Sequence, residues 1–247
     1  MDPLQNEWMG FIKVIARFAI QSKTLNMQEK ITNPFARLIG LRYKSHPWHG
    51  IDAGGEAPEV VKSFIEIVPS DTVKYEVDKE SGYLMIDRPQ KFSNIIPSLY
   101  GFIPQTYCGE TVADKSRNIL ERKEIVGDGD PLDILILTEK EITHGDILVY
   151  ARPIGGLRMI DGQQADDKII AVMFNDALYS QYKSINDVPD PIVRRLEHYF
   201  LTYKDMPGEH RDCEITHVYD VPEAHDLIRR SMKDYKNYVE ELLFEDR

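Results

Sequence analysis

The chain has 247 residues, 42% of them hydrophobic and 29% charged, and a formal net charge of −11. These proportions are typical of a globular protein with a core that needs no disulfide staples. The acidic balance disfavours a nucleic-acid partner, because domains that bind nucleic acid usually carry a basic surface. No run of about eighteen uninterrupted apolar residues occurs, so no membrane span is expected. Cys108 and Cys213 lie far apart outside any CxxC pair, which is typical of a reducing compartment.

The first 26 residues predict an amphipathic helix and exclude a secretory signal peptide. Asp2 and Glu7 stand where a signal peptide needs positive charge, and Lys13 and Arg17 interrupt its apolar run. Apolar residues recur at helical spacing at Trp8, Phe11, Ile12, Ile15 and Phe18. We expect this stripe to pack on the protein body or on a partner subunit, with a membrane-surface helix as the alternative. Met27 offers a second start for the chain.

Residues 30–62 predict loop, and the region after them predicts a series of short strands. The loop contains "HPWHGIDAGGEAPE", and its two histidines are either metal ligands or plain loop residues. The strands are rich in β-branched and aromatic residues and are separated by turn residues. They cover residues 63–68, 73–78, 83–88, 132–137, 146–154 and 168–174.

Two helices are predicted near the end of the chain. Residues 190–204 carry Asp190 as an N-cap and Pro191 at the first helical position. The apolar face of this helix consists of Val193, Leu196, Tyr199, Phe200 and Tyr203. A final helix follows Pro222, with apolar residues in register at Leu227, Ile228, Met232 and Tyr235. Strands followed by helices indicate an α+β fold, with a closed or nearly closed antiparallel barrel as its core.

Three aspartates precede an apolar strand in the segment "GDGDPLDILIL", residues 127–137. The carboxylates of Asp128, Asp130 and Asp133 repel one another unless cations neutralise them. Hard cations such as Mg²⁺ take oxygen ligands of this kind. A calcium loop of the EF-hand type is excluded, because Asp133 stands where that loop needs glycine and a strand follows in place of a helix. A solvated acidic turn is the alternative.

A second acidic segment, "MIDGQQADDK", lies between two apolar strands and carries Asp161, Asp166, Asp167 and Lys168. By itself it fits a polar hairpin tip. Together with the first cluster it could hold two or more metal ions, which can clamp the attacking and leaving oxygens of a phosphoryl transfer. Lys74, Arg88 and Lys204 could contact a phosphate, although the strand with Lys74 also fits a solvated face. The sequence contains no P-loop, HExxH or GxSxG motif.

The segment "DGDPLD" at residues 128–133 resembles the signature of the soluble family I inorganic pyrophosphatases. Further segments are similar to that family in order and spacing: "IEI", "KYEVDKESG", "IDR", "YGFIP", "MIDGQQADDK" and "YKD". "HPWHG" and "EAP" also look like the segment ahead of the barrel in some members. The resemblance covers about residues 60–235 and implies an OB-like five-stranded antiparallel β-barrel with flanking helices. It predicts one catalytic domain at residues 46–247 and an N-terminal extension, helix plus loop, at residues 1–45.

The resemblance also implies a role for each matching residue. It implies that metal ions are bound by Asp128, Asp130, Asp133, Asp161, Asp166 and, through water, Glu66. It implies that the phosphates of the substrate are bound by Lys74, Arg88, Tyr203 and Lys204, with Lys168 in support. It assigns the catalytic machinery to Asp130, which takes a proton from the nucleophilic water, and to the supporting residues Glu76 and Tyr100.

The implied activity is metal-dependent hydrolysis of inorganic pyrophosphate to two orthophosphates by a metal-activated water, with Asp130 as general base. The resemblance implies several Mg²⁺ ions per active site, with Mn²⁺ able to substitute, in a cytoplasmic homo-oligomer without a nucleic-acid partner. One departure is that Tyr100 and Asp128 lie 28 positions apart, farther than in compact bacterial members. "CGETVADKSRNILERKEIV", residues 108–126, therefore looks like an insertion. Two rival functions stay open: hydrolysis of another phosphoanhydride, such as a nucleotide, and oligonucleotide binding by a barrel.

Overall fold

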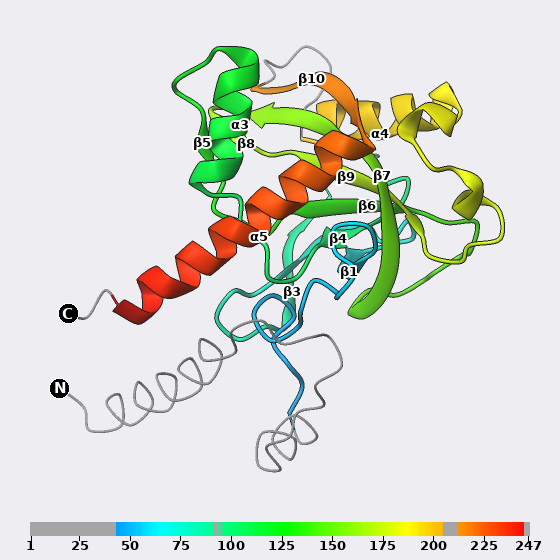
Figure 1. Cartoon of the computed structure of the whole chain (residues 1–247). Helices are drawn as coiled ribbons and strands as arrows, with labels where there is room; N and C mark the ends of the chain where they lie inside the picture. Colours follow the sequence, from blue (N-terminus) through cyan, green and yellow to red (C-terminus); the bar gives the residue numbers. More distant parts are fainter. Residues whose placement is uncertain (1–42, 91–92, 94, 205–211, 245–247) are drawn as a thin grey trace. The chain divides into compact units, whose positions relative to one another are not determined.

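Five strands form a closed ring in the computed structural model, which describes residues 43–90, 93, 95–204 and 212–244 (Figure 1). In ring order they are β1 (Val61–Ile67), β4 (Leu99–Phe102), β6 (Asp133–Leu137), β9 (Lys168–Met173) and β7 (Ile147–Asp161), and β7 pairs back onto β1. All five lie in one compact unit, Ser45–Tyr235, and the chain from Lys236 belongs to a second unit. The predicted helix within residues 1–26 lies outside the described residues, and the predicted domain boundary after residue 45 stays a prediction.

The ring mixes parallel and antiparallel pairs, so the strictly antiparallel barrel predicted from the sequence is wrong in this respect. β6 and β9 run parallel, with Asp133 opposite Lys168, and the other four neighbouring pairs run antiparallel. A closed ring with an odd number of strands cannot reverse direction at every step, so at least one pair must be parallel. The same pair sets Asp133 and Lys168 side by side. The OB-like character of the barrel stays a prediction.

The apolar run of β6 is buried on both of its faces. Ile134 and Ile136 belong to one buried cluster, which also contains residues of the C-terminal helix α5 (Val221–Phe244). Leu135 and Leu137 belong to a second cluster, which contains residues of α4 (Asp190–Thr202). Successive side chains of a strand point to opposite faces, so an uninterrupted apolar run fits a strand that is covered on both sides.

The remaining strands form a separate hairpin or pair at the edges of the ring. β2 (Val73–Val77) and β3 (Leu84–Pro89) form an antiparallel hairpin, as the alternating sequence predicts. β10 (Cys213–Asp220) pairs with β7, while the short strands β5 (Val126–Gly127) and β8 (Gln164–Ala165) run parallel to each other. β4, β5, β8 and β10 lie outside the strands predicted from the sequence. β7 also continues to Asp161, seven residues beyond its predicted end at residue 154.

The two predicted helices correspond to α4 and α5, and the described residues contain one more α-helix, α3 (Glu110–Leu120). The N-cap of α4 is Pro189 rather than the predicted Asp190, which lies in the first turn and makes no cap hydrogen bond. A carboxylate there still stabilises the positive end of the helix dipole. The short 3-10 helices η1 (Tyr179–Gln181) and η2 (Ile185–Asp187) precede α4. Among the helices of the described residues, none has the length and apolar character needed to cross a bilayer.

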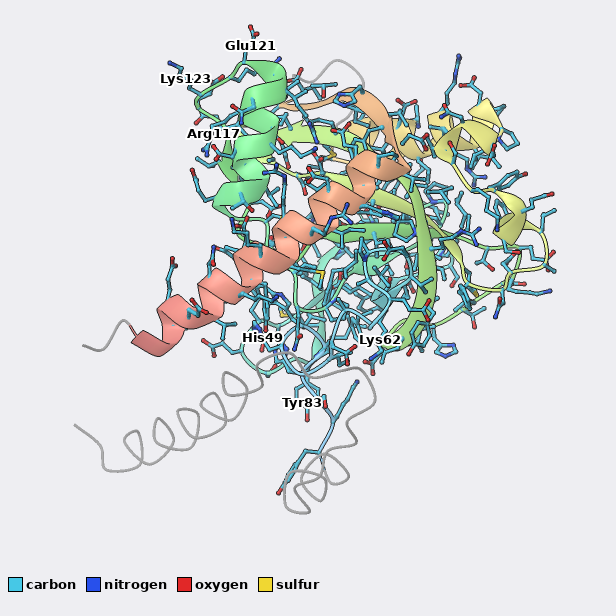
Figure 2. All side chains as sticks on the ribbon, in the orientation of Figure 1. His49, Lys62, Tyr83, Arg117, Glu121 and Lys123 are labelled. Carbon is cyan, nitrogen blue, oxygen red and sulfur yellow. The ribbon has the colours of Figure 1, made fainter. Side chains whose placement is uncertain are left out.

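The helix α3 occupies the segment that looks like an insertion. Asp234 of α5 accepts hydrogen bonds from the backbone N–H groups of Gly109 (3.2 Å), Thr111 (3.0 Å) and Val112 (3.1 Å). A carboxylate from another helix therefore caps the N-terminus of α3, where free N–H groups and the helix dipole favour negative charge. The turn after α3 carries the exposed charged side chains of Glu121 and Lys123 (Figure 2).

Candidate active site

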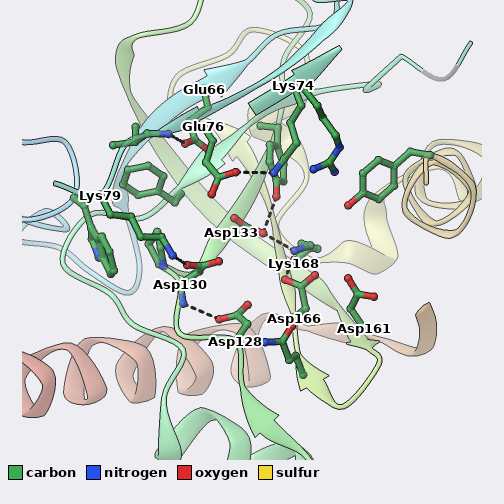
Figure 3. A pocket seen from close by; sticks show the side chains of 18 of the residues that line it. Glu66, Lys74, Glu76, Lys79, Asp128, Asp130, Asp133, Asp161, Asp166 and Lys168 are labelled. Carbon is green, nitrogen blue, oxygen red and sulfur yellow. Dashed lines mark hydrogen bonds and ion pairs between the residues drawn. The ribbon is translucent and has the colours of Figure 1, made fainter. Parts of the chain in front are cut away.

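One cavity of about 220 Å³ collects the side chains that the sequence singles out (Figure 3). All thirteen predicted site residues line it: Glu66, Lys74, Glu76, Arg88, Tyr100, Asp128, Asp130, Asp133, Asp161, Asp166, Lys168, Tyr203 and Lys204. They come from both acidic segments, from the β2–β3 hairpin, from β1 and β4 and from the end of α4. The fold therefore brings all of them together, while the role of each residue stays a prediction.

Three of the seven acidic side chains of the cavity lie at or beside the ends of strands. Asp133 is the first residue of β6, Asp161 is the last residue of β7, and Asp166 lies two residues before the first residue of β9, Lys168. The backbone at a strand end is fixed by its ladder of hydrogen bonds, so its side chain faces the cavity in a defined position. This explains why negative charge stands directly beside the core.

The chain before α3 holds the loop with the first two aspartates. The Asp130 N–H donates to Asp128 Oδ1 at 3.0 Å, and Gly129 between them has a φ of +77°, a backbone conformation that glycine adopts without strain. The backbone N–H of Cys108 donates to the Asp130 carbonyl at 2.8 Å, and the Gly129 N–H donates to the Cys108 carbonyl at 3.1 Å. The loop is thus fixed from within and by the insertion segment.

The β2–β3 hairpin supplies a basic wall opposite the aspartates. Lys74 and Glu76 lie two positions apart on β2, so their side chains share one face, and their charged ends are 2.9 Å apart. Lys74 stands opposite Arg88 in the register of the hairpin. Asp87 pairs with both cations, at 3.1 Å from Lys74 and 2.6 Å from Arg88. Two cations held in this way can contact the oxygens of an anion.

A dense network joins Tyr100, Asp133, Lys168 and Asp166. The Tyr100 hydroxyl donates to Asp133 Oδ2 at 2.7 Å, and the Lys168 ammonium contacts both Asp133 and Asp166. Burial alone would lower the pKa of Lys168, but the charges of Asp133 and Asp166 outweigh burial and raise it well above its ordinary value. Lys168 therefore stays protonated at neutral pH and links the two acidic segments.

Several carboxyl groups lie in the interior of the cavity, where burial disfavours their charged form. Burial raises the pKa of Glu66 to about 8, although the backbone N–H of Val77 donates to its carboxylate at 2.7 Å. Burial, and then the nearby charge of Asp166, raises the pKa of Asp128 well above its ordinary value. The pKa of Asp166 is also raised by burial, in spite of its contact with Lys168. Carboxylates in this environment are stabilised by any cation that joins them.

Residues 63–236 match the family model described as inorganic pyrophosphatase, over more than half of the chain. The chain belongs to the inorganic pyrophosphatase family.

Similar proteins are found both among characterised sequences and among solved structures. The chain is 48% identical over 198 residues to an inorganic pyrophosphatase of Chlamydia trachomatis, covering 78% of this chain and 95% of that one. It is 34% identical over 199 residues to a soluble inorganic pyrophosphatase of rice, covering 81% and 83% of the two chains. The crystal structure of inorganic pyrophosphatase from Thermus thermophilus matches with a TM-score of 0.65 at 30% identity, covering 78% of this chain and 99% of that one. The ring of strands and its helices are thus the fold of this family.

The carboxylate donors that line the cavity suit hard divalent cations. Every predicted ligand offers a carboxylate oxygen, the donor that Mg²⁺ and Mn²⁺ prefer. In the part of the chain that the structure describes, no three His, Cys, Asp or Glu side chains converge as a ready-made metal site. Lysines pair with the carboxylates instead: Lys79 with Asp130, Lys204 with Asp161, and Lys168 with both Asp133 and Asp166. By the chemistry of its donors, the site fits such ions.

Sequence reasoning missed several residues that line the cavity, and Lys79 is the most informative of them. It lies in the turn between β2 and β3, lines the cavity and pairs with Asp130. The segment "KYEVDKESG" contains it, but an exposed lysine in a turn carries no signal of its own. Gln164 at the tip between β7 and β9 also lines the cavity, as do Trp48, Val77, Phe102 and Pro131.

The histidines of "HPWHG" make hydrogen bonds that fix the local structure of their loop. The His46 ring nitrogen accepts hydrogen bonds from the backbone N–H groups of Trp48 (3.1 Å) and His49 (3.3 Å). The His49 ring contacts the Tyr235 hydroxyl at 2.9 Å, and burial lowers the pKa of His49 to about 4. The buried Trp48 donates its indole N–H to the Thr106 carbonyl at 2.8 Å, which anchors the loop to the core.

Proposed function

We propose that this chain hydrolyses inorganic pyrophosphate to two orthophosphates in the cavity, with divalent metal ions as cofactors. The observation that carries the proposal is the joining of two acidic segments and a basic hairpin wall in one cavity, within a chain of this family. Pyrophosphate is small and highly charged. A cavity of about 220 Å³ lined by carboxylates, lysines and an arginine suits it better than it suits a nucleotide, because sites for larger ligands usually exceed about 300 Å³ and are mostly apolar.

The basic residues bind and orient the substrate. Arg88 can form two parallel hydrogen bonds to one phosphate group, and Lys74 beside it contributes a point charge. Tyr203 and Lys204 follow the end of α4 and contact the phosphate group from another wall of the cavity. These contacts stabilise the negative charge on the phosphates and hold the phosphorus atom in line with the attacking water.

Asp130 acts as the general base. Its side chain is 44% exposed, more than that of Asp133 at 21%, so water can reach it. The hydrogen bond to Asp128 and the Cys108 backbone contacts fix its position. Asp130 takes a proton from the water that attacks phosphorus, while Glu76 orients Lys74 and Tyr100 orients Asp133. No Ser or Cys nucleophile is required.

Bound divalent cations supply charge neutralisation of the substrate and a lowered pKa for the attacking water. Asp128, Asp133, Asp161 and Asp166 would hold them directly, with Asp130 as a further ligand and Glu66 acting through water. The lysines that pair with these carboxylates would then be available to the phosphate oxygens. We propose Mg²⁺ as the physiological ion, with Mn²⁺ able to replace it, and a cytoplasmic homo-oligomer with an OB-like barrel in each subunit.

The test is phosphate release from pyrophosphate, tripolyphosphate and ATP, each with Mg²⁺. We expect pyrophosphate to have the highest kcat/KM. An Asp161→Asn variant purified in parallel serves as the blank, because a contaminating hydrolase would act equally in both preparations. Faster release from ATP would favour a nucleotide hydrolase. Absence of release from all three substrates would contradict hydrolysis and leave the oligonucleotide-binding alternative.

A further inference from the structure

The second acidic segment contains two adjacent aspartates of opposite orientation. Asp166 and Lys168 line the cavity, whereas Asp167 between them is 1% exposed and lies on the opposite face of the strand. Successive side chains of an extended chain point to opposite faces, so two adjacent aspartates must point in opposite directions. This alternation does not determine which of the two faces the cavity. A shift of one residue would bring Asp167 to the cavity and carry Asp166 and Lys168 into the core.

A fully buried arginine accompanies the inward aspartate. Arg158 of β7 is 0% exposed, and its Nε donates to both carboxylate oxygens of Asp167, at 3.3 and 3.1 Å. Its Nη2 lies 3.1 Å from Asp167 Oδ2 and 3.0 Å from Glu223 Oε1 of α5. The guanidinium also lies 5.5 Å from the centre of the Tyr219 ring. These contacts give the buried carboxylate of Asp167 a cationic partner on β7.

The neighbouring residue of β7 fixes the backbone at the same place. The backbone N–H of Met159 donates to Asp167 Oδ1 at 3.3 Å, and its carbonyl accepts the N–H of Asp166 at 3.0 Å. The inward row of β9 otherwise consists of apolar residues, including Ile169 and Ala171. A charge in that row is costly unless it is paired, so the row accepts Asp167 only because of Arg158.

We propose that Arg158 and Asp167 are positioning residues for the active site. Their buried ion pair sets the register in which Asp166 and Lys168 face the cavity, and neither residue touches the substrate. Register selection is the best attested use of a buried polar group, since such a pair adds little net stability. The inference rests on the proposed function in so far as Asp166 and Lys168 take part in that reaction.

Arg158→Met tests the proposal, because it leaves Asp167 buried without its partner. The carboxylate then favours solvent, and Asp166 and Lys168 lose their positions. We expect kcat per folded molecule to fall on the order of 10- to 100-fold, the effect of misplacing a catalytic group by about 1 Å. Amide exchange at residues 165–168 should become faster under conditions where the protein is folded. Adding Asp167→Leu removes the unpaired charge and should restore most of kcat.

Arg152→Met is the matched control. Arg152 lies on the same strand, donates from Nη2 to the carbonyls of Ser180 (2.7 Å) and Tyr182 (2.9 Å), and does not line the cavity. It should lower the melting temperature and leave kcat and KM unchanged. If Arg158→Met does not fold, Arg158→Lys replaces it as the test. Lysine keeps the charge but cannot donate two hydrogen bonds to Asp167 in the way that a guanidinium does. We then expect a smaller loss of kcat than for Arg158→Met, and faster amide exchange at residues 165–168 than in the parent.

Two results would overturn the proposal. One is a folded Arg158 variant with parental kcat, KM and exchange. The other is a double variant that stays as impaired as Arg158→Met. Failure of the proposed function itself would be recognised separately, because the parental chain would then release no phosphate from pyrophosphate. The rate of amide exchange at residues 165–168, compared between the Arg158 variants and the parent, would still show whether Arg158 holds this segment in place.

Discussion

Tyr100 shows how a single hydroxyl is placed in the site. It donates to Asp133 at 2.7 Å, while its ring packs 6.0 Å from that of Phe200. Tyr100→Phe keeps the ring packing and removes a hydrogen bond to a charged group, which contributes about 1.5–3 kcal/mol. We therefore expect kcat/KM for pyrophosphate to fall by about tenfold or more, and the melting temperature to fall as well because the folded state loses this hydrogen bond. Steady-state kinetics and thermal unfolding of both proteins give the answer, and an unchanged kcat/KM would show that this hydroxyl does not orient Asp133.

At the residue scale, the sequence predicts the members of the site but not its internal contacts. Asp128, Asp130 and Asp133 could be found because carboxylates this close need a cation. Lys79 could not, because only the folded hairpin brings its turn to Asp130. The inward orientation of Asp167 could not be predicted from the sequence either, because it depends on Arg158 of a neighbouring strand.

At the element scale, strands in which apolar and polar residues alternate strongly were predictable, and strands in which this alternation is weak were not. β10 was missed because its residues are mostly half-buried and a bulge between Ile215 and His217 interrupts the pattern. β7 was predicted too short because Gly155 and Gly156 resemble a turn. In the fold, a side chain at Gly156 would lie 2.5 Å from the ring of Tyr219, so glycine lets β10 approach β7. The helix α3 was missed because its N-cap is Gly109, which offers no capping side chain, and the cap comes from Asp234 far along the chain.

Asp176 follows β9 and joins the chain after β6 to the start of η1. Its contacts give a prediction about how stability depends on pH. Its carboxylate accepts from the Thr138 hydroxyl (2.6 Å) and from the backbone N–H groups of Glu139 (3.0 Å), Leu178 (2.9 Å) and Tyr179 (2.7 Å). Burial would raise the pKa of Asp176, but these hydrogen bonds outweigh it and lower the pKa below its ordinary value of 3.8. A lowered pKa stabilises the fold above the pKa of the unfolded chain, and this contribution is lost as pH falls through the folded pKa.

Asp176→Asn should therefore be less stable than the parent at pH 7, by about 1–3 kcal/mol. The difference should stay constant down to about pH 5 and shrink below about pH 4. Urea unfolding at several pH values measures it. Asp190→Asn is the control, because its side chain is 70% exposed on α4. A difference that does not change between pH 7 and pH 3 would contradict the proposed role of the ionised carboxylate.

At the scale of the whole molecule, metal binding should be coupled to stability. Asp128 and Asp133 belong to the first acidic segment and Asp161 and Asp166 to the second, so a cation that joins the two segments stabilises the folded state only. At a concentration of about 100 times its dissociation constant, Mg²⁺ should add about 2.7 kcal/mol and raise the melting temperature. Na⁺ at equal ionic strength is the control and should have no such effect. EDTA should abolish phosphate release, and Mg²⁺ should restore it. Full activity after exhaustive chelation would refute the metal mechanism.

The N-terminal extension should be separable from the chemistry. All thirteen predicted site residues lie within Ser45–Tyr235. A chain that begins at Met27 should therefore hydrolyse pyrophosphate with a kcat close to that of the full chain. If the apolar stripe of residues 8–18 packs against another subunit, light scattering should show a changed oligomer mass. A folded truncation with a large loss of kcat would show that the extension reaches the active site.

The most direct test of the whole account is the kcat of Asp130→Asn for pyrophosphate with saturating Mg²⁺. The asparagine keeps the size of the side chain and an oxygen ligand, but it accepts no proton from the attacking water. We predict a loss of at least about 100-fold, the usual scale for removing a general base, with the fold and the Mg²⁺-dependent rise in melting temperature retained. A purified variant with near-parental kcat would contradict the account, because the water would then be activated without Asp130.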